Sequence, residues 1–244
     1  MYEEDITMDK IRKKVYVRII PESNEITFSG IEFTEFIRYI PYPLNNLLLL
    51  KGDGFGNRRV YNFELFEGQE CVLSLSKEHV HDYGDFSFVD YSTSNAVNEL
   101  SKEQVAELLY LGHMHSPLKS PFLEVLKNKF VYLAHDDGWY CKLYCQNIND
   151  FITVLLRKIA SNFPVKNICE ISDCVTERIL IQARDGLLID LDEVVSDNGS
   201  ATLMLYSIGE FVDMDAIFND VGRIKCNAAR VTRLCYYKEI WLLH

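Results

Sequence analysis

The amino-acid sequence predicts an α+β fold, an antiparallel β-sheet built from hairpins and covered by about three to four helices. Three observations lead to this prediction. The chain has 244 residues, 48% of them hydrophobic, so it can bury a substantial core. Short apolar segments separated by turn residues fill the first hundred residues and are typical of strands. After them, capping residues precede segments rich in helix formers.

The first hundred residues are expected to be mostly β. Residues 14–20 (KVYVRII) and 25–30 (EITFSG) are two predicted strands joined by the turn residues PESN. A short helix is predicted over 32–40 and should end before Pro41, because the residue before a proline avoids the helical region. After the aliphatic run over 47–50 and a glycine turn, further strands are predicted in the segments VYNFELF, CVLSLS and FSFVDY.

Stronger helix signals follow. Ser101 and Gln104 form a capping box that opens a helix over 101–112, with Gly112 as its stop. Residues 129–145 are predicted to form a hairpin, because Asp-Gly at its centre is a favoured turn. The clearest helix is expected over 150–162 and ends before a proline.

The last third of the chain mixes both kinds of element. Residues 178–191 (RILIQARDGLLIDL) form either a hairpin about Asp-Gly or a helix capped by that glycine. A strand is predicted over 202–207. A helix over 208–221 should follow, opened by a second capping box and closed by Gly222. Residues 230–243 are predicted to be the closing strand.

The softest boundary in the chain lies over 161–168 (SNFPVKNI). We therefore predict a β-rich α+β domain over 1–162, with a C-terminal α+β subdomain over 163–244 packed on it. A single domain over 1–244 is the alternative.

Charge, the N-terminal segment and the cysteines exclude several classes of function and indicate a location. Lysine and arginine number 25 against 36 acids, a net charge of −11, so the chain should repel nucleic acid and anionic membranes. The charged N-terminus does not resemble a signal peptide, and the aliphatic run over 47–50 is too short to span a bilayer. Seven scattered cysteines suggest reduced thiols. The expected location is the cytoplasm, and a homodimer is left open.

Histidines carry the sharpest chemical signal. Five of the six fall in three clusters with acids nearby, and imidazole and carboxylate are the usual ligands of zinc and related divalent ions. Two histidines separated by one residue converge on an ion from a strand but diverge by about 200° on a helix. The predicted helix stop leaves the second cluster in a loop, which permits convergence. The candidate ligands are His79, His81, His113, His115, His135 and Asp136.

Three short segments resemble known families. GHMHSPLKSPFLE (112–124) resembles the JAMM metalloproteases, with altered spacing after the histidines and Glu124 in place of their aspartate ligand. HVHDYGD (79–85) is similar to the HxHxDH signature of metallo-β-lactamase-type hydrolases, with Asp82 one place early. EFTEFIRYIPYPLNNLLLLKGDG (32–54) resembles the opening of SUKH-type immunity proteins, which bind and neutralise toxins.

Tyrosines mixed with acids suggest a protein interface. Aromatic anchors carry contact energy, and an acidic rim suits a basic partner. Strand alternation over 140–146 places its tyrosines on the polar face. The predicted interface residues are Tyr83, Asp85, Tyr91, Asp137, Tyr140 and Tyr144.

Two functional hypotheses follow. The first is an intracellular, non-catalytic interaction protein without a cofactor, which binds a basic protein partner in an immunity, antitoxin or inhibitor-like role. The second is a metal-dependent hydrolase that uses the clustered histidines and Asp136 as ligands of a divalent ion such as zinc.

Overall fold

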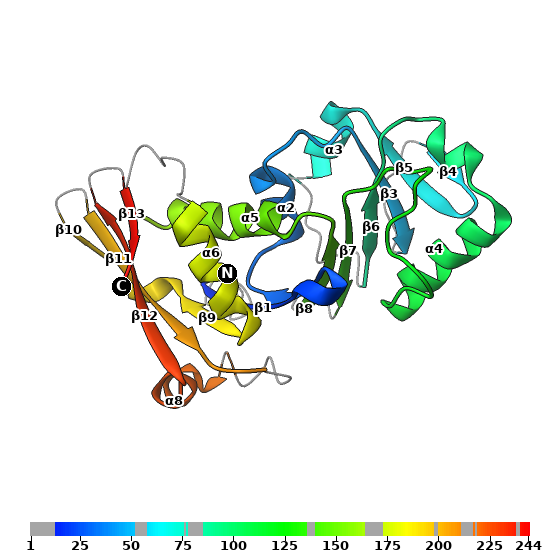
Figure 1. Cartoon of the computed structure of the whole chain (residues 1–244). Helices are drawn as coiled ribbons and strands as arrows, with labels where there is room; N and C mark the ends of the chain where they lie inside the picture. The colour runs from blue at the N-terminus through cyan, green and yellow to red at the C-terminus, as the bar shows by residue number, and fades with distance from the viewer. Residues whose placement is uncertain are drawn as a thin grey trace, which may run out of the picture. The chain divides into compact units, whose positions relative to one another are not determined.

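A computed structural model of the chain describes residues 13–51, 58–75, 77, 85–135, 140–163, 173–197, 200–210, 217, 219–237 and 240–244. Its strands form a mostly antiparallel sheet accompanied by helices, so the predicted α+β class is confirmed (Figure 1). No helix within these residues is long and apolar enough to cross a membrane.

The chain divides into two compact units. The terminal unit takes its described residues from Met1–Pro21, Thr27–Glu32 and Asn149–His244, and the central unit from Glu22–Ile26 and Phe33–Ile148. This division differs from the expected boundary after residue 162. Strand β1 (Lys14–Ile20) belongs with the C-terminal half because it pairs with β9 (Leu187–Asp190), where Lys14 lies opposite Asp190.

The central unit is built around strands in the order β8-β7-β6-β3-β5-β4. Its hairpin β7–β8 has the register expected from the Asp-Gly signal, with Phe130 opposite Cys145, although the turn lies outside the described residues. The elements are α2 (Phe33–Tyr39), β3 (Asn46–Lys51), β4 (Arg58–Val60), β5 (Phe63–Glu67), α3 (Gln69–Leu75), β6 (Ser87–Asp90), η3 (Ala96–Glu99), α4 (Lys102–Met114), β7 (Phe130–His135) and β8 (Tyr140–Cys145). Strand β2 (Glu25–Ser29) and the 3-10 turn η1 (Pro21–Ser23) contain residues of both units.

Two of the predicted strands in this unit were wrong. Tyr61 and Asn62 both adopt left-handed backbone angles and form the tight turn between β4 and β5, so residues 60–66 contain a turn. The segment over 71–76 lies mostly in helix α3. Gly68, at φ +89°, lets the chain leave β5, and its carbonyl accepts from the Val72 N–H.

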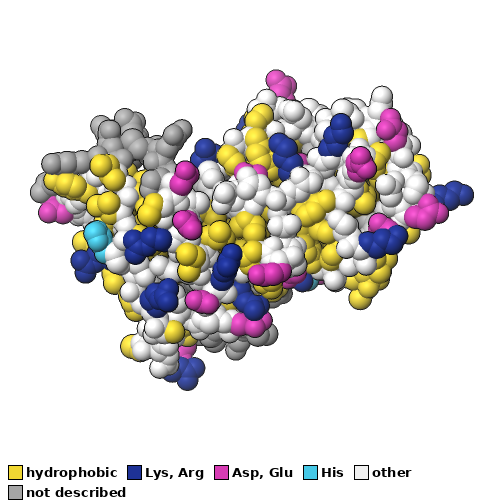
Figure 2. All heavy atoms as spheres, viewed as in Figure 1, with side chains coloured by type: hydrophobic (Ala, Val, Ile, Leu, Met, Phe, Trp, Pro, Cys, Tyr) yellow, Lys and Arg dark blue, Asp and Glu magenta, His cyan; other side chains and the backbone are white. Residues whose placement is uncertain are grey.

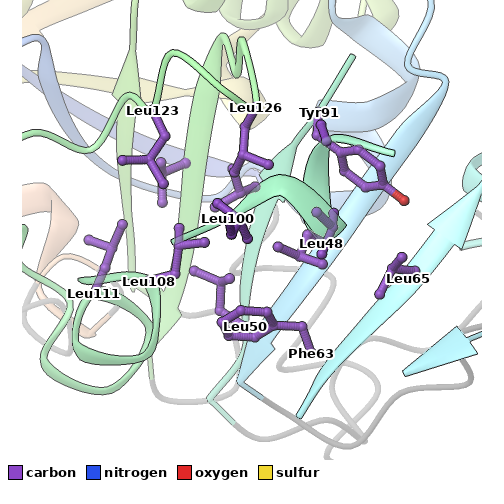
Figure 3. Packing of buried hydrophobic residues seen from close by; sticks show 14 of the residues in the cluster. Leu48, Leu50, Phe63, Leu65, Tyr91, Leu100, Leu108, Leu111, Leu123 and Leu126 are labelled. Atoms are coloured by element: carbon purple, nitrogen blue, oxygen red, sulfur yellow. The ribbon is translucent and has the colours of Figure 1, made fainter. Parts of the chain in front are cut away.

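Helix α4 packs its apolar side on the sheet of the central unit. Leucines from α4, β3 and β5 and from the loops before and after α4 meet in one cluster (Figure 3). Gly112 permits the close approach, because a Cβ built there would lie 2.8 Å from the Cβ of Leu50. The helix is buried at this point, so replacing the glycine would push α4 off β3.

The terminal unit contains strands in the order β13-β12-β11-β9-β1, with β10 paired to β11. Helix α6 packs on β1, β9 and β13. Gly186, at φ +69°, separates α6 from β9, so the helix alternative for residues 178–191 is correct. The elements besides β1 and β9 are α5 (Ile148–Ser161), α6 (Asp173–Arg184), η5 (Leu191–Glu193), β10 (Val195–Asp197), β11 (Ser200–Ser207), α8 (Val221–Cys226), β12 (Arg230–Tyr237) and β13 (Ile240–Leu243).

Two expectations for the terminal unit need correction. The helix predicted over 208–221 does not begin at 208–210, which are non-helical, and Gly222 lies inside α8 instead of closing a helix. Most of 211–218 lies outside the described residues. The single closing strand is a hairpin, in which β12 pairs with β13 from Leu234 opposite Leu243 to Tyr237 opposite Ile240.

A buried carboxylate joins several elements of the terminal unit. Asp190, at the end of β9, forms ion pairs with Lys14 of β1 and Lys225 of α8. Lys14 also forms an ion pair with Asp192, and Lys225 forms one with Glu193. In each pair the lysine Nζ lies 2.8 Å from a carboxylate oxygen. Burial acts to lower the pKa of Lys14, but its two carboxylate partners outweigh burial and the pKa is raised. Every charge in the group thus has an opposite charge beside it.

Asp90 is the corresponding buried acid of the central unit. Its Oδ1 accepts from the backbone N–H groups of Lys129 and Phe130, both at 2.8 Å, and so ties the end of β6 to the start of β7. Burial raises the pKa of Asp90 to about 6, although these hydrogen bonds act to lower it. The charged form of Asp90 is therefore disfavoured by the fold at neutral pH.

We expect Gly112→Ala to lower the free energy of unfolding by about 1–3 kcal/mol, because the new methyl group meets Leu50. Urea unfolding followed by circular dichroism measures this change. Gly222→Ala in α8 is the matched control, since a Cβ there meets nothing within 4 Å, and alanine should be neutral or stabilising by up to about 1 kcal/mol. Equal effects at the two positions would contradict the packing of α4 on β3.

Asp190→Asn should destabilise the protein by about 3 kcal/mol, because it leaves Lys14 and Lys225 partly uncompensated in a buried position. Asp197→Asn, on the exposed strand β10, should change the stability by less than about 0.5 kcal/mol. Thermal and urea unfolding of both variants test this. A stable Asp190→Asn protein would show that the ion pairs are not needed to join these elements.

The stability should depend on pH through Asp90. Its folded pKa of about 6 exceeds the ordinary value of 3.8, so its contribution favours the folded state below pH 4 and is lost as the pH rises through 6. The difference corresponds to roughly 3 kcal/mol. Asp90→Asn keeps an oxygen acceptor and should flatten this part of the stability curve between pH 4 and 7. An unchanged curve in the variant would rule out Asp90 as its source.

Candidate metal centre

Strands β6 and β7 bring an acid and a histidine together in the central unit. The two strands are antiparallel with Ser87 opposite Leu133, and the Ala134 N–H donates to the Phe86 carbonyl at 2.8 Å. The ladder therefore continues toward Asp85, which precedes β6, and His135, which ends β7. Two residues that are 50 positions apart in the sequence thus meet at one end of this strand pair.

The third residue comes from the end of helix α4. The capping box of Ser101 and Gln104 opens the helix, as predicted, and the helix ends at His115 with φ +50° and ψ +33°. The Gly112 carbonyl accepts from Ser87 Oγ at 3.4 Å, which places the last turn of α4 beside β6. The His115 side chain then lies inside the unit and is only 4% exposed.

The left-handed backbone of His115 has an energetic cost. Glycine is the usual residue at such a helix end, and a side chain there costs of order 1 kcal/mol. Histidine, asparagine and aspartate are the side chains that tolerate this conformation best. A buried imidazole at a position that favours glycine points to a role for the ring.

The two imidazoles are in direct contact. Their Nδ1 atoms are 2.9 Å apart, and His115 Nδ1 also contacts Nε2 of His135. The rings meet edge to face with centroids 3.7 Å apart. With one ligand atom from each residue, Asp85, His115 and His135 place these atoms within 4.8 Å of one another.

These separations fit a shared divalent ion. Ligand atoms about 2.0–2.2 Å from zinc lie roughly 3–3.5 Å from one another in tetrahedral or neighbouring octahedral positions. The three ligand atoms, within 4.8 Å of one another, would have to draw closer to reach that geometry. The same ring positions also allow one hydrogen bond between two neutral imidazoles, with one ring as donor and the other as acceptor.

The predicted ligands have different outcomes. His115 and His135 come together. His113 lies in the last turn of α4 and is exposed, because the helix continues past Gly112 to Met114 and residues two apart on a helix diverge. The predicted loop from residue 113 was therefore wrong. His79, His81 and Asp136 lie outside the described residues.

Sequence reasoning assigned Asp85 to a protein interface and missed it as a candidate ligand. Its separation from both histidine partners hides it from any motif of fixed spacing. Only the register of β6 on β7 places Asp85 near His135.

The predicted interface residues do not form one exposed surface. Tyr91 and Tyr144 are buried in the core cluster of the central unit. Burial, followed by the nearby Glu25 carboxylate, raises the pKa of Tyr144. The Tyr140 ring centroid lies 5.7 Å from that of His135, so Tyr140 and Asp85 belong to the histidine cluster. Tyr83 and Asp137 lie outside the described residues.

The surplus of acids does not gather on the face of the protein shown in Figure 2. Acidic and basic side chains are interspersed there, with apolar side chains between them (Figure 2). Among the described residues drawn there, the acidic side chains therefore form no continuous surface that would attract a basic partner.

No protein-family model, curated protein or solved structure matches this chain. The resemblances to JAMM proteases, metallo-β-lactamases and SUKH proteins thus remain similarities of short segments.

Proposed function

We propose that the central unit binds a divalent transition-metal ion through Asp85, His115 and His135. The observation that carries this proposal is the convergence of one carboxylate and two imidazoles from three separate elements, with ligand atoms within 4.8 Å of one another. A buried histidine in a left-handed conformation supports it.

The ligand set favours zinc or a related ion. Two imidazole nitrogens and one carboxylate oxygen suit zinc and ferrous iron, whereas magnesium and calcium prefer oxygen ligands. Cysteine is not among the three residues, and structural zinc sites usually have four protein ligands that include thiolates.

Within the described residues the site has three ligands, and three protein ligands would leave a coordination position for water or substrate, as in catalytic zinc sites. At Asp85, His115 and His135, a bound zinc ion would supply an activated water at neutral pH, because zinc lowers the pKa of its bound water to about 7. We therefore propose metal-dependent hydrolysis as the class of reaction.

The positions of the predicted interface residues favour a metal site over a protein interface. Of the six residues expected at an interface, two are buried and two lie at the histidine cluster. Net charge remains the only support for a basic partner.

The purified protein should contain about one equivalent of zinc, iron or manganese when no chelator or metal-affinity tag is used. Elemental analysis measures it, before and after dialysis against zinc. Asp85→Asn, His115→Asn and His135→Ala should each lose most of the metal. Asparagine is chosen at position 115 because it tolerates the left-handed backbone, so the variant removes the imidazole with little added strain.

His113→Ala is the matched control for this experiment, since it removes an exposed histidine from the same helix turn and should keep the metal. Circular dichroism confirms that each variant is folded. Metal that is retained in His115→Asn, or lost equally in His113→Ala, would overturn the site. Chromogenic esters and phosphoesters, tested with the same variants, show whether the bound ion supports hydrolysis.

A further inference from the structure

We propose that the central unit has a second binding site, for an amphipathic organic anion, in a groove along residues 42–44. Two hollows of about 280 Å³ and 190 Å³ share Tyr42, Pro43 and Leu44 as lining residues. This groove shares no residue with the metal centre. The hollows differ in chemistry, which indicates the kind of ligand.

The larger hollow is mainly apolar. Ile37 and Ile40, at the end of α2, and Val72 and Leu73 of α3 line it. Leu73 is 46% exposed, although it lies beside buried apolar residues of the same helix. An aliphatic or aromatic body in this hollow would remove that surface from water, at a gain of roughly 25 cal/mol per Å².

The smaller hollow is polar and has cations at its rim. Lys127 and Lys129 line it. Lys129 Nζ lies 3.9 Å from the centroid of the Tyr42 ring, so a cation is held beside the segment that both hollows share. Lys127 sits in a left-handed turn at φ +50°, and its N–H donates to the Leu123 carbonyl at 2.9 Å.

The buried polar side chains that line the smaller hollow, Asn46 and Asp90, already have hydrogen-bond partners within the protein. The Asn46 amide donates to the carbonyls of Tyr91 and Ser92, and its oxygen accepts from the Gly68 N–H. Asp90 accepts from two backbone N–H groups. A ligand would therefore be recognised by the lysines at the rim.

The charges of the lining residues indicate which charge the ligand would carry. The chain as a whole has more acids than bases, yet the residues lining the two hollows include three cations, Arg38, Lys127 and Lys129, and one acid, Asp90. Asp90 is buried and accepts from two backbone N–H groups, so the exposed charges among the lining residues are those of the three cations. A carboxylate or phosphate group would thus lie at the lysines, with its apolar body between α2 and α3.

Isothermal titration calorimetry tests this proposal with four probes of equal chain length, each below its micelle-forming concentration. Decanoate and decyl phosphate carry an anionic group, decanol is neutral and decyltrimethylammonium is a cation. At least one anion should bind about fivefold or more tightly than decanol and the cation. Binding of one anion and not the other identifies the group as a carboxylate or a phosphate.

Variants locate the site. Lys127→Glu should weaken anion binding about fivefold and leave decanol unaffected, whereas Leu73→Asp should weaken all ligands that enter the apolar hollow. Lys102→Glu, at the exposed start of α4, is the control for charge reversal and should change nothing. The proposal fails if no anion binds at millimolar concentration, if decanol binds as tightly as the anions, or if Lys127→Glu and Leu73→Asp bind like the wild type.

Discussion

The close approach of α4 to β3 is the constraint on which the candidate site depends. Gly112 allows the helix to lie against Leu50, and Ser87 Oγ donates to the Gly112 carbonyl. These contacts fix the position of the last helical turn on the sheet. The helix ends three residues after Gly112, in the left-handed conformation of His115. A shift of α4 away from β3 would move the His115 ring relative to His135. A packing constraint in the core therefore places a functional group at its edge.

The structure handles its buried charges in two different ways. In the terminal unit, Asp190 is surrounded by lysines, and the ion pairs join β1, β9 and α8. In the central unit, Asp90 has backbone N–H groups as its partners, and burial raises its pKa. Proton binding to Asp90 would therefore stabilise the fold.

Local signals in the sequence were enough to predict the helices over 101–112 and 150–162 and the hairpin over 129–145, because caps, helix formers and turn residues act within a few positions. The local signals were misleading at residues 71–76, which were predicted as a strand. There the left-handed conformation of Gly68 ends β5, and helix α3 follows directly. The local signals also ended α4 at Gly112, because a glycine that permits close packing looks the same in sequence as one that ends a helix.

The candidate site was only partly predictable for the same reason. The sequence drew attention to His115 and His135, but it grouped each with its neighbours in the chain. The register of β6 on β7 adds Asp85 to the candidate ligands. His113 is not among them, because the helix continues beyond it. Long-range pairing decides which residues meet, and no pattern of fixed spacing reports it.

The most direct test of the account is anomalous diffraction at the zinc absorption edge from crystals of the protein equilibrated with equimolar zinc. The account predicts one strong peak about 2.0–2.2 Å from a carboxylate oxygen of Asp85 and from one imidazole nitrogen each of His115 and His135. A map without a peak there, with the two imidazoles hydrogen-bonded to each other, would contradict it.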